Sequence, residues 1–293
     1  MNYRRLGTSD LSVSEIGFGC MSLGSDHSRN ERTLRSAADS GINFFDTADL
    51  YDKGWNEESV GKALKPIRDQ VIIATKVGNQ WRKDGSGWDW NPRKEYILKA
   101  VEDSLRRLQI NTIDLYQLHG GTIEDPIDET IEAFELLKEQ GKIREYGISS
   151  IRPNVIRRWA EHSNMVSVMM QYSLLDRRPE EECLNLLHQK NISVITRGSL
   201  AKGLLIDKPA KEYLGYSKEE VEELQVELRK TGKSIASALH FVLQHSAVAS
   251  AVVGIRTIDQ LKSVVSAFED SVSDEILSKL GSVLEPKKYE MHK

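Results

Sequence analysis

Short apolar runs alternate with longer amphipathic segments along most of the chain. The apolar runs are centred near residues 17, 43, 73, 115, 147, 170, 194 and 251, and their composition predicts buried strands. After each run, apolar residues recur at helical spacing, which predicts helices over residues 29–40, 56–65, 93–108, 127–140, 153–162, 179–189, 234–245 and 257–268. Apolar strands that alternate with helices are typical of a parallel sheet covered by helices. Eight such units in 293 residues favour one closed (β/α)8 barrel, a TIM barrel of the α/β class, over an open doubly wound sheet.

Four segments lie outside this alternation. Residues 3–14 carry turn-forming residues between two short mixed segments, which predicts an N-terminal β-hairpin. Residues 78–92 are rich in Gly, Trp and Asp and are expected to form a loop. A charged helix over 217–230, before the last barrel helices, and a final helix over 273–284 are additions to an ideal barrel. Because no linker or low-complexity stretch interrupts the pattern, we expect a single domain over residues 1–293.

Composition narrows the classes of function. Hydrophobic residues make up 39% and charged residues 29%, and the net charge of −4 argues against a nucleic-acid partner. The only two cysteines, Cys20 and Cys183, predict no disulfide framework and suit a reducing cytoplasm. No cysteine–histidine cluster suggests a metal site, no apolar run has the length of a membrane span, and the N-terminus lacks the apolar core of a signal peptide. A soluble cytoplasmic protein is expected.

Polar residues occur where three neighbouring apolar strands end. Asp46, Lys76 and His119 lie at, or within one residue of, the ends of the strands predicted over 42–46, 71–77 and 113–119, and Tyr51 follows in a polar loop. Taken singly, each has an ordinary explanation: the aspartate caps a helix, the histidine is hydrogen-bonded structure, and the lysine is solvated. The active sites of such barrels lie at the carboxyl ends of the strands. Four such residues on adjacent strand ends therefore indicate a site.

The chemistry of these four side chains is complementary. A free tyrosine has a pKa near 10 and is a reluctant proton donor at neutral pH. A lysine ammonium at about 4 Å stabilises the phenolate by roughly 4 kcal/mol at an effective dielectric of about 20. Desolvation opposes this effect, so we expect a smaller net fall in the pKa of Tyr51. With Asp46 keeping Lys76 charged and His119 donating to a carbonyl oxygen, the group is suited to protonating a developing alkoxide.

These residues occur in motifs that resemble the aldo-keto reductases. The motifs are FDTA at 45–48 followed by Tyr51, ATK at 74–76 and LH at 118–119, and the resemblance runs from residue 3 to residue 256. It implies a barrel that binds NADP(H) without a Rossmann fold and reduces aldehydes or ketones to alcohols by hydride transfer. By this resemblance Tyr51 is the general acid, Lys76 and Asp46 tune it, and His119 positions the carbonyl of a small-molecule substrate. The absence of a GxGxxG motif after a strand agrees with this.

The same resemblance implies where the cofactor binds. The nicotinamide carboxamide falls to Ser149 and Gln171, with Ser150 where the family commonly has asparagine. Arg197 takes the place of the aromatic residue that stacks on the nicotinamide, and an arginine can either lie flat on a ring or reach a phosphate. Arg256, at a helix start, is expected to pair with the 2′-phosphate of NADP. The other implied positions are Gly198, Ser199, Leu200, Lys202 and Gly203 in the loop after the seventh strand, and Gly254 and Gln260 around the eighth.

Two other functions remain open at this point. A redox-sensing regulatory subunit of the same fold would bind NADPH with little turnover. A Schiff-base aldolase would use Lys76 as its nucleophile, and the pairing of that lysine with Asp46 and Tyr51 ranks this function last. Four tryptophans either form an aromatic rim for an apolar aldehyde or pack a loop against the barrel, namely Trp55, Trp81, Trp88 and Trp90.

Overall fold

The computed structural model describes residues 1–293 and contains a closed barrel of eight parallel strands. Each strand pairs with its neighbours along the chain, and the last pairs with the first. The strands are β3 (Ile16–Gly19), β4 (Phe44–Asp46), β5 (Ile72–Val77), β8 (Ile113–Leu118), β9 (Ile143–Ser149), β10 (Ser167–Gln171), β11 (Ser193–Arg197) and β12 (Val248–Gly254). The predicted (β/α)8 barrel is confirmed.

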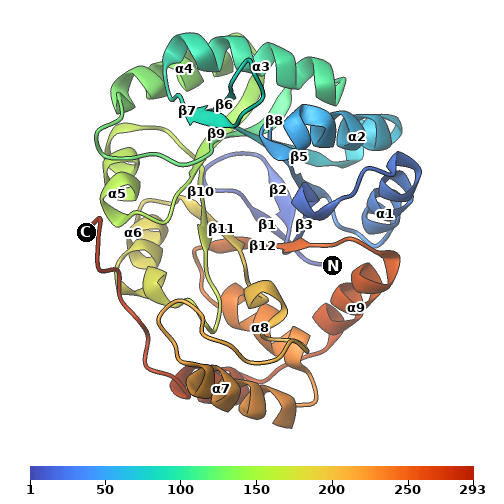
Figure 1. The fold of residues 1–293 in the computed structure, drawn as a ribbon, viewed down its shortest axis with the longest axis vertical. Helices are drawn as coiled ribbons and strands as arrows, with labels where there is room; N and C mark the ends of the chain where they lie inside the picture. Colours follow the sequence, from blue (N-terminus) through green and yellow to red (C-terminus); the bar gives the residue numbers. More distant parts are fainter.

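Helices form a ring around the strands (Figure 1). Those that follow barrel strands are α1 (His27–Asp39), α2 (Trp55–Leu64), α3 (Lys94–Leu108), α4 (Ile127–Glu139), α5 (Pro153–His162), α6 (Cys183–Gln189), α8 (Ser234–Leu243) and α9 (Ile258–Glu269). The two predicted additions are present as α7 (Lys218–Lys230) and α10 (Asp274–Ser282). None of these helices is both long enough and apolar enough to cross a lipid bilayer.

Two apolar layers hold the barrel together. The larger cluster lies between strands and helices, and a smaller one fills the barrel with alternate strand residues such as Phe44, Ile72 and Leu115. Because side chains alternate along a strand, Lys76 faces the same interior as Ile72, four positions earlier, and Gln117 the same interior as Leu115, two positions earlier. Lys76 and Gln117 are both fully buried. The packing therefore directs both side chains into the barrel interior.

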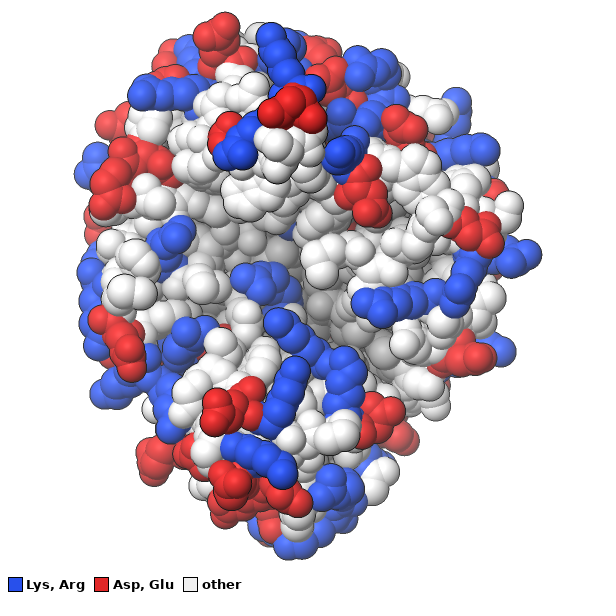
Figure 2. Space-filling model, in the orientation of Figure 1, with Lys and Arg blue, Asp and Glu red and all other residues white.

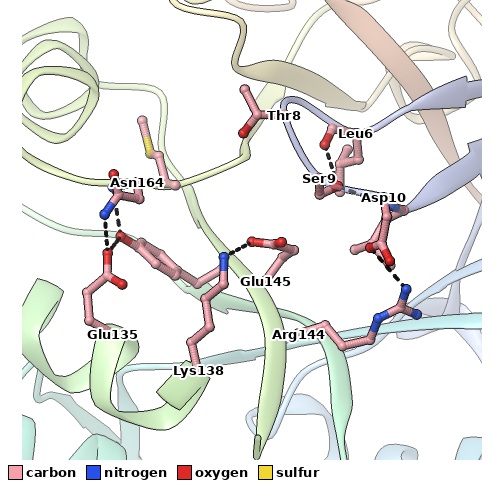
Figure 3. A network of polar contacts seen from close by, with 12 residues as sticks. Leu6, Thr8, Ser9, Asp10, Glu135, Lys138, Arg144, Glu145 and Asn164 are labelled. Carbon is pink, nitrogen blue, oxygen red and sulfur yellow. Dashed lines mark hydrogen bonds and ion pairs between the residues drawn. The ribbon is translucent and has the colours of Figure 1, made fainter.

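The N-terminal hairpin of β1 (Tyr3–Arg5) and β2 (Ser12–Ser14) covers the amino end of the barrel. At its turn, Gly7 has φ +56°, and a Cβ there would lie 2.4 Å from the carbonyl oxygen of Val166, so only glycine fits. Ion pairs add to the contact, with Asp10 of the hairpin 3.1 Å from Arg144 of β9 (Figure 3). The hairpin is drawn faint, behind the barrel, in Figure 1, so the nearer face is the carboxyl end.

The structure differs from the sequence prediction in three local details. The segment 78–92, expected as a loop, contains a second hairpin of β6 (Asn79–Trp81) and β7 (Trp88–Trp90), which turns through Gly85 at φ +72°. The helix expected over 179–189 begins as a 3-10 turn, Arg178–Glu181, and becomes α-helical only at Cys183. The strand expected over 42–46 starts to pair at Phe44.

Candidate active site

A buried ion pair lies at the carboxyl ends of β4 and β5. The apolar residues of these strands place Asp46 and Lys76 in the barrel interior, where their side chains are 6% and 1% exposed. Nζ of Lys76 donates to Oδ2 of Asp46 at 2.7 Å, to the backbone oxygen of Thr47 at 2.7 Å and to the hydroxyl of Tyr51 at 3.3 Å. All three ammonium hydrogens are therefore used. The four predicted residues begin to converge at this lysine.

Tyr51 reaches the ion pair from a tight turn. It begins the 3-10 segment Tyr51–Gly54, in which Asp52 and Lys53 have φ of 48° and 55°. Gly54 follows at φ +89°, and a Cβ there would lie 2.7 Å from the side chain of Arg107. Backbone in the left-handed region is unfavourable for residues other than glycine and persists only where surrounding contacts hold it. The turn aims the phenol at Lys76, whose Nζ lies 5.1 Å from the ring centroid.

His119 completes the group from the end of β8. Its backbone N–H donates to the carbonyl of Val77 at 2.8 Å, and its ring meets that of Tyr51 edge-on, with centroids 5.8 Å apart. The Nδ1 atom is buried without a partner in the protein. Burial, reinforced by the charges of Lys76 and Arg197, lowers the pKa of His119 to about 3. At neutral pH the imidazole is therefore uncharged and carries one N–H donor.

The expected fall in the pKa of Tyr51 is wrong. Burial raises the pKa above its ordinary value and outweighs the opposing charge of Lys76, while Asp46 also raises it. Lys76 itself stays charged, because Asp46 and Tyr51 more than offset the effect of burial and raise its pKa. A protonated phenol beside a permanent ammonium is the result, so Tyr51 is a stronger acid than burial alone would leave it and a weaker acid than free tyrosine.

Two buried residues at the start of α2 tie the Tyr51 turn to the barrel. The hydroxyl of Thr47 donates to Asn56 at 2.7 Å, and the hydroxyl of Thr75 donates to Glu57 at 2.5 Å. Glu57 also accepts from Arg107 of α3 at 2.6 Å. Thr47 and Thr75 directly follow and precede members of the ion pair, so α2 fixes the turn against both strand ends. Asn56 and Glu57 were not among the residues predicted from the sequence, although a polar pair at the start of a helix that faces the barrel was a visible signal.

Gln117 is a second omission and lies closer to the chemistry. Its side-chain amide donates to Oδ1 of Asp46 at 3.2 Å from a position that is fully buried. A glutamine that faces a barrel interior two residues before a predicted site histidine was the available signal, because buried amides need partners.

The residues predicted for the nicotinamide lie on the next strands around the barrel. Ser149, Gln171 and Arg197 are the last residues of β9, β10 and β11, and Gln171 pairs with Arg197 in the strand register. The Gln171 amide donates to the Tyr213 hydroxyl at 3.0 Å and accepts from Arg197 at 3.2 Å. Ser150 is buried, and its hydroxyl accepts the backbone N–H of Arg152.

Arg197 belongs to this arc of strand ends, from β9 to β11, and acts electrostatically on the group that contains Asp46, Tyr51 and His119. Its guanidinium is exposed, and its charge acts on the pKa of all three side chains. No carboxylate pairs with it in the structure. A guanidinium without an acidic partner at this position is free to contact an anionic or aromatic group of a ligand.

The loop after β11 forms a second group of predicted positions. Gly198, Lys202 and Gly203 have φ of +71°, +57° and +93°, and Ser199 is held by Thr196 through a 2.9 Å hydroxyl contact. The side chain of Leu200 packs against the apolar core. Lys202 is exposed and without an acidic partner, so its ammonium faces solvent at the carboxyl end of the barrel.

The third group surrounds the start of α9. Gly254 ends β12 in an exposed position, and Arg256 is exposed two residues later. Thr257 caps the helix, because its hydroxyl oxygen accepts the backbone N–H of Gln260. The side-chain oxygen of Gln260 in turn accepts the backbone N–H of Arg256 at 2.9 Å. Gln260 therefore holds the helix start, with only its amide N–H groups left for another partner.

Each of these three groups presents an exposed basic side chain. Arg197, Lys202 and Arg256 are cations without acidic partners, and each follows or ends a barrel strand. The space-filling view shows a hollow at the centre of the carboxyl face, with basic side chains at and below it (Figure 2). Such a set of donors matches phosphate oxygens.

The tryptophans of the second hairpin serve mainly to pack it. The indole N–H of Trp90 donates to Asp125 at 3.0 Å. The ring packs closely against Gly78, where an added Cβ would lie 2.7 Å from it. Trp81 is covered by Lys53, whose Nζ lies 5.3 Å from the ring centroid. Trp88 is 47% exposed and forms part of the surface instead. Packing thus accounts for two of the four tryptophans.

A family model and individual proteins match the chain. The model of the Aldo/keto reductase family covers residues 15–285. The uncharacterized oxidoreductase YqkF of Bacillus subtilis is 52% identical over 283 residues, or 91% of this chain and 91% of that protein. The holo structure of aldo-keto reductase AKR11C1 from Bacillus halodurans has a TM-score of 0.97 and 51% identity, and the match covers 100% of this chain and 99% of that one. The NADH-specific methylglyoxal reductase of Escherichia coli is 34% identical over 71% of this chain and 70% of that protein.

In barrels of this kind the active site lies at the carboxyl ends of the strands, where Asp46, Lys76, His119 and Tyr51 converge. With the family model covering most of its length, the chain belongs to the aldo/keto reductase family. Members of this family are oxidoreductases that bind a nicotinamide cofactor, so the chain is an oxidoreductase.

Proposed function

We propose that this enzyme reduces aldehydes or ketones to alcohols with NADPH, and that Tyr51 is its general acid. The observation that carries the proposal is the position of Lys76, whose Nζ lies 3.3 Å from the Tyr51 hydroxyl and 2.7 Å from Asp46. A phenol that is protonated at neutral pH and faces a fixed ammonium can release its proton to an alkoxide, because the phenolate that remains is stabilised at once.

His119 orients the substrate in this proposal. Because its pKa is about 3, the ring is neutral and donates its N–H without transferring a proton. The carbonyl oxygen then lies between the His119 N–H and the Tyr51 hydroxyl. The rings of these two residues meet at 82°. Two donors aimed at one oxygen stabilise the negative charge that develops there.

The cofactor is held by the arc from β9 to β12. When bound, the reduced nicotinamide supplies the hydride. Gln171 and Ser149 hold its carboxamide. Gln171 must then give up its present hydrogen bonds to Tyr213 and Arg197. The unpaired cations Lys202 and Arg256 receive the phosphates, and Arg256 at the start of α9 favours the 2′-phosphate of NADPH.

The direct test is a panel of aldehydes and ketones assayed by absorbance with NADPH and with NADH. Repeated turnover that is lost in Tyr51→Phe, while cofactor binding survives, supports the proposal. A general acid contributes roughly 10²–10⁴-fold. A variant that kept most of its kcat, with chemistry rate-limiting, would remove Tyr51 from this role. A faster reaction with NADH would assign this chain the cofactor that the name of its Escherichia coli relative states.

A further inference from the structure

Gln117 contacts the ion pair that stands behind the proposed acid. Its Nε2 lies 3.2 Å from Oδ1 of Asp46, while Oδ2 of the same carboxylate accepts from Lys76 at 2.7 Å. A carboxylate only accepts hydrogen bonds, so the amide must present its nitrogen and not its oxygen. The two donors therefore divide the two oxygens of Asp46 between them.

The environment of Gln117 gives the fold no other reason to keep it. The side chain is fully buried, and its Oε1 has no hydrogen-bond partner in the protein. A buried amide with an unpaired oxygen is less favourable than an apolar side chain of the same size. Leu115, two residues earlier on the same face, shows that β8 places apolar residues here without difficulty.

We propose that Gln117 is a positioning residue of the active site: its amide holds Asp46 ionised and oriented so that Asp46 keeps Lys76 charged and aimed at Tyr51. This inference rests on the proposed function of Tyr51. Gln117 acts through Asp46 and touches neither substrate nor cofactor.

The electrostatics agree with this geometry. Burial raises the pKa of Asp46 above its ordinary value, and Lys76, then the Gln117 hydrogen bond and then Arg197 offset only part of this rise. Cys20, whose thiol is buried beside Asp46, is neutral because its own pKa is well above the ordinary value. Tyr51, whose pKa the charge of Asp46 raises, is a further titratable neighbour. Loss of the Gln117 donor should therefore raise the pKa of Asp46 and weaken its hold on Lys76.

The test compares Gln117→Met, which keeps the length but loses the donor, with Gln117→Glu, which donates only while protonated. Carboxyl 13C NMR, with Asp46 assigned through Asp46→Asn, follows the titration of Asp46 without requiring turnover. We expect its midpoint to rise in Gln117→Met and kcat for carbonyl reduction to fall by about tenfold or more, with KM little changed. Gln117→Glu should retain activity at low pH and lose it as the introduced carboxyl ionises, because two carboxylates then share the site.

Ser250→Ala is the matched control. Its hydroxyl is also buried and unpaired on a barrel strand, and it makes no contact with the four site residues. It should leave both the Asp46 titration and kcat unchanged, and thermal melting confirms that all variants are folded. An unchanged Asp46 midpoint together with wild-type kcat in Gln117→Met would overturn the inference. If the wild type reduces no carbonyl at all, the proposed function fails, and the Asp46 titration still decides the contact with Gln117.

Discussion

Replacing Lys76 with methionine tests how the ion pair acts on the acid. At 3.3 Å from the Tyr51 hydroxyl, the ammonium stabilises the phenolate by about 5 kcal/mol at an effective dielectric of about 20. This corresponds to a factor of roughly 5000 in the acid dissociation constant. Asp46 opposes it, so the figure is an upper limit. We therefore expect Lys76→Met to lower kcat by about 100-fold to 1000-fold while cofactor affinity changes little.

The assay is single-turnover reduction followed by cofactor absorbance, with a deuterated cofactor to establish that hydride transfer limits the rate. If Lys76 acts only through the phenol, Lys76→Met combined with Tyr51→Phe should be no slower than Tyr51→Phe alone. Additive losses would refute this reasoning, as would a Lys76→Met variant that keeps more than about a tenth of kcat. Lys76→Met alone leaves the Asp46 carboxylate buried without its partner, which costs about 3–5 kcal/mol of stability. The double variant with Asp46→Asn leaves no buried charge and therefore serves as a control for loss of folding.

Three further predictions concern the arc and the histidine. Arg256→Ala should weaken NADPH binding by about tenfold or more and NADH binding much less, measured by calorimetry, because charge-assisted hydrogen bonds contribute about 1.5–3 kcal/mol. Equal losses for both cofactors would count against a 2′-phosphate contact. Arg197→Tyr should narrow the difference in affinity between NADPH and NADP+, because a cation beside the ring repels only the oxidised form; an unchanged ratio would place the guanidinium elsewhere. Because burial lowers the pKa of His119 to about 3, kcat/KM for reduction should show no inflection between about pH 5 and 8. An inflection near 6.5 that disappears in His119→Asn would contradict this.

The strand alternation and the strand-end residues were readable because each depends on local pattern. Asp46 ends an apolar run, and the period of two along β5 places Lys76 beside Ile72 in the barrel interior. The β6–β7 hairpin was missed because Gly and Asp dominated the segment. The Asp84-Gly85 pair within it is a hairpin signal that, with Trp81 and Trp88 on either side, would have found it.

The pKa of Tyr51 was misjudged for a different reason. Its value depends on how far burial disfavours the phenolate, and burial follows from packing that no short motif specifies. The partner of Gln117 was equally hidden, since a glutamine in an apolar strand gives no sign of what it contacts until β4 and β8 are placed on either side of β5. Burial and contacts between residues distant in sequence therefore become visible only in the structure.

The hairpin at the amino end leaves the barrel with one entrance. Leu6, Leu11 and Val13 join the inner apolar layer there, and Gly7 donates to Ser193 at the start of β11. Nothing can pass through the barrel, so every molecule that reaches Tyr51 must leave by the route along which it came. Two molecules that bind in such a closed-ended pocket must do so in order: the one that binds deeper enters first and leaves last.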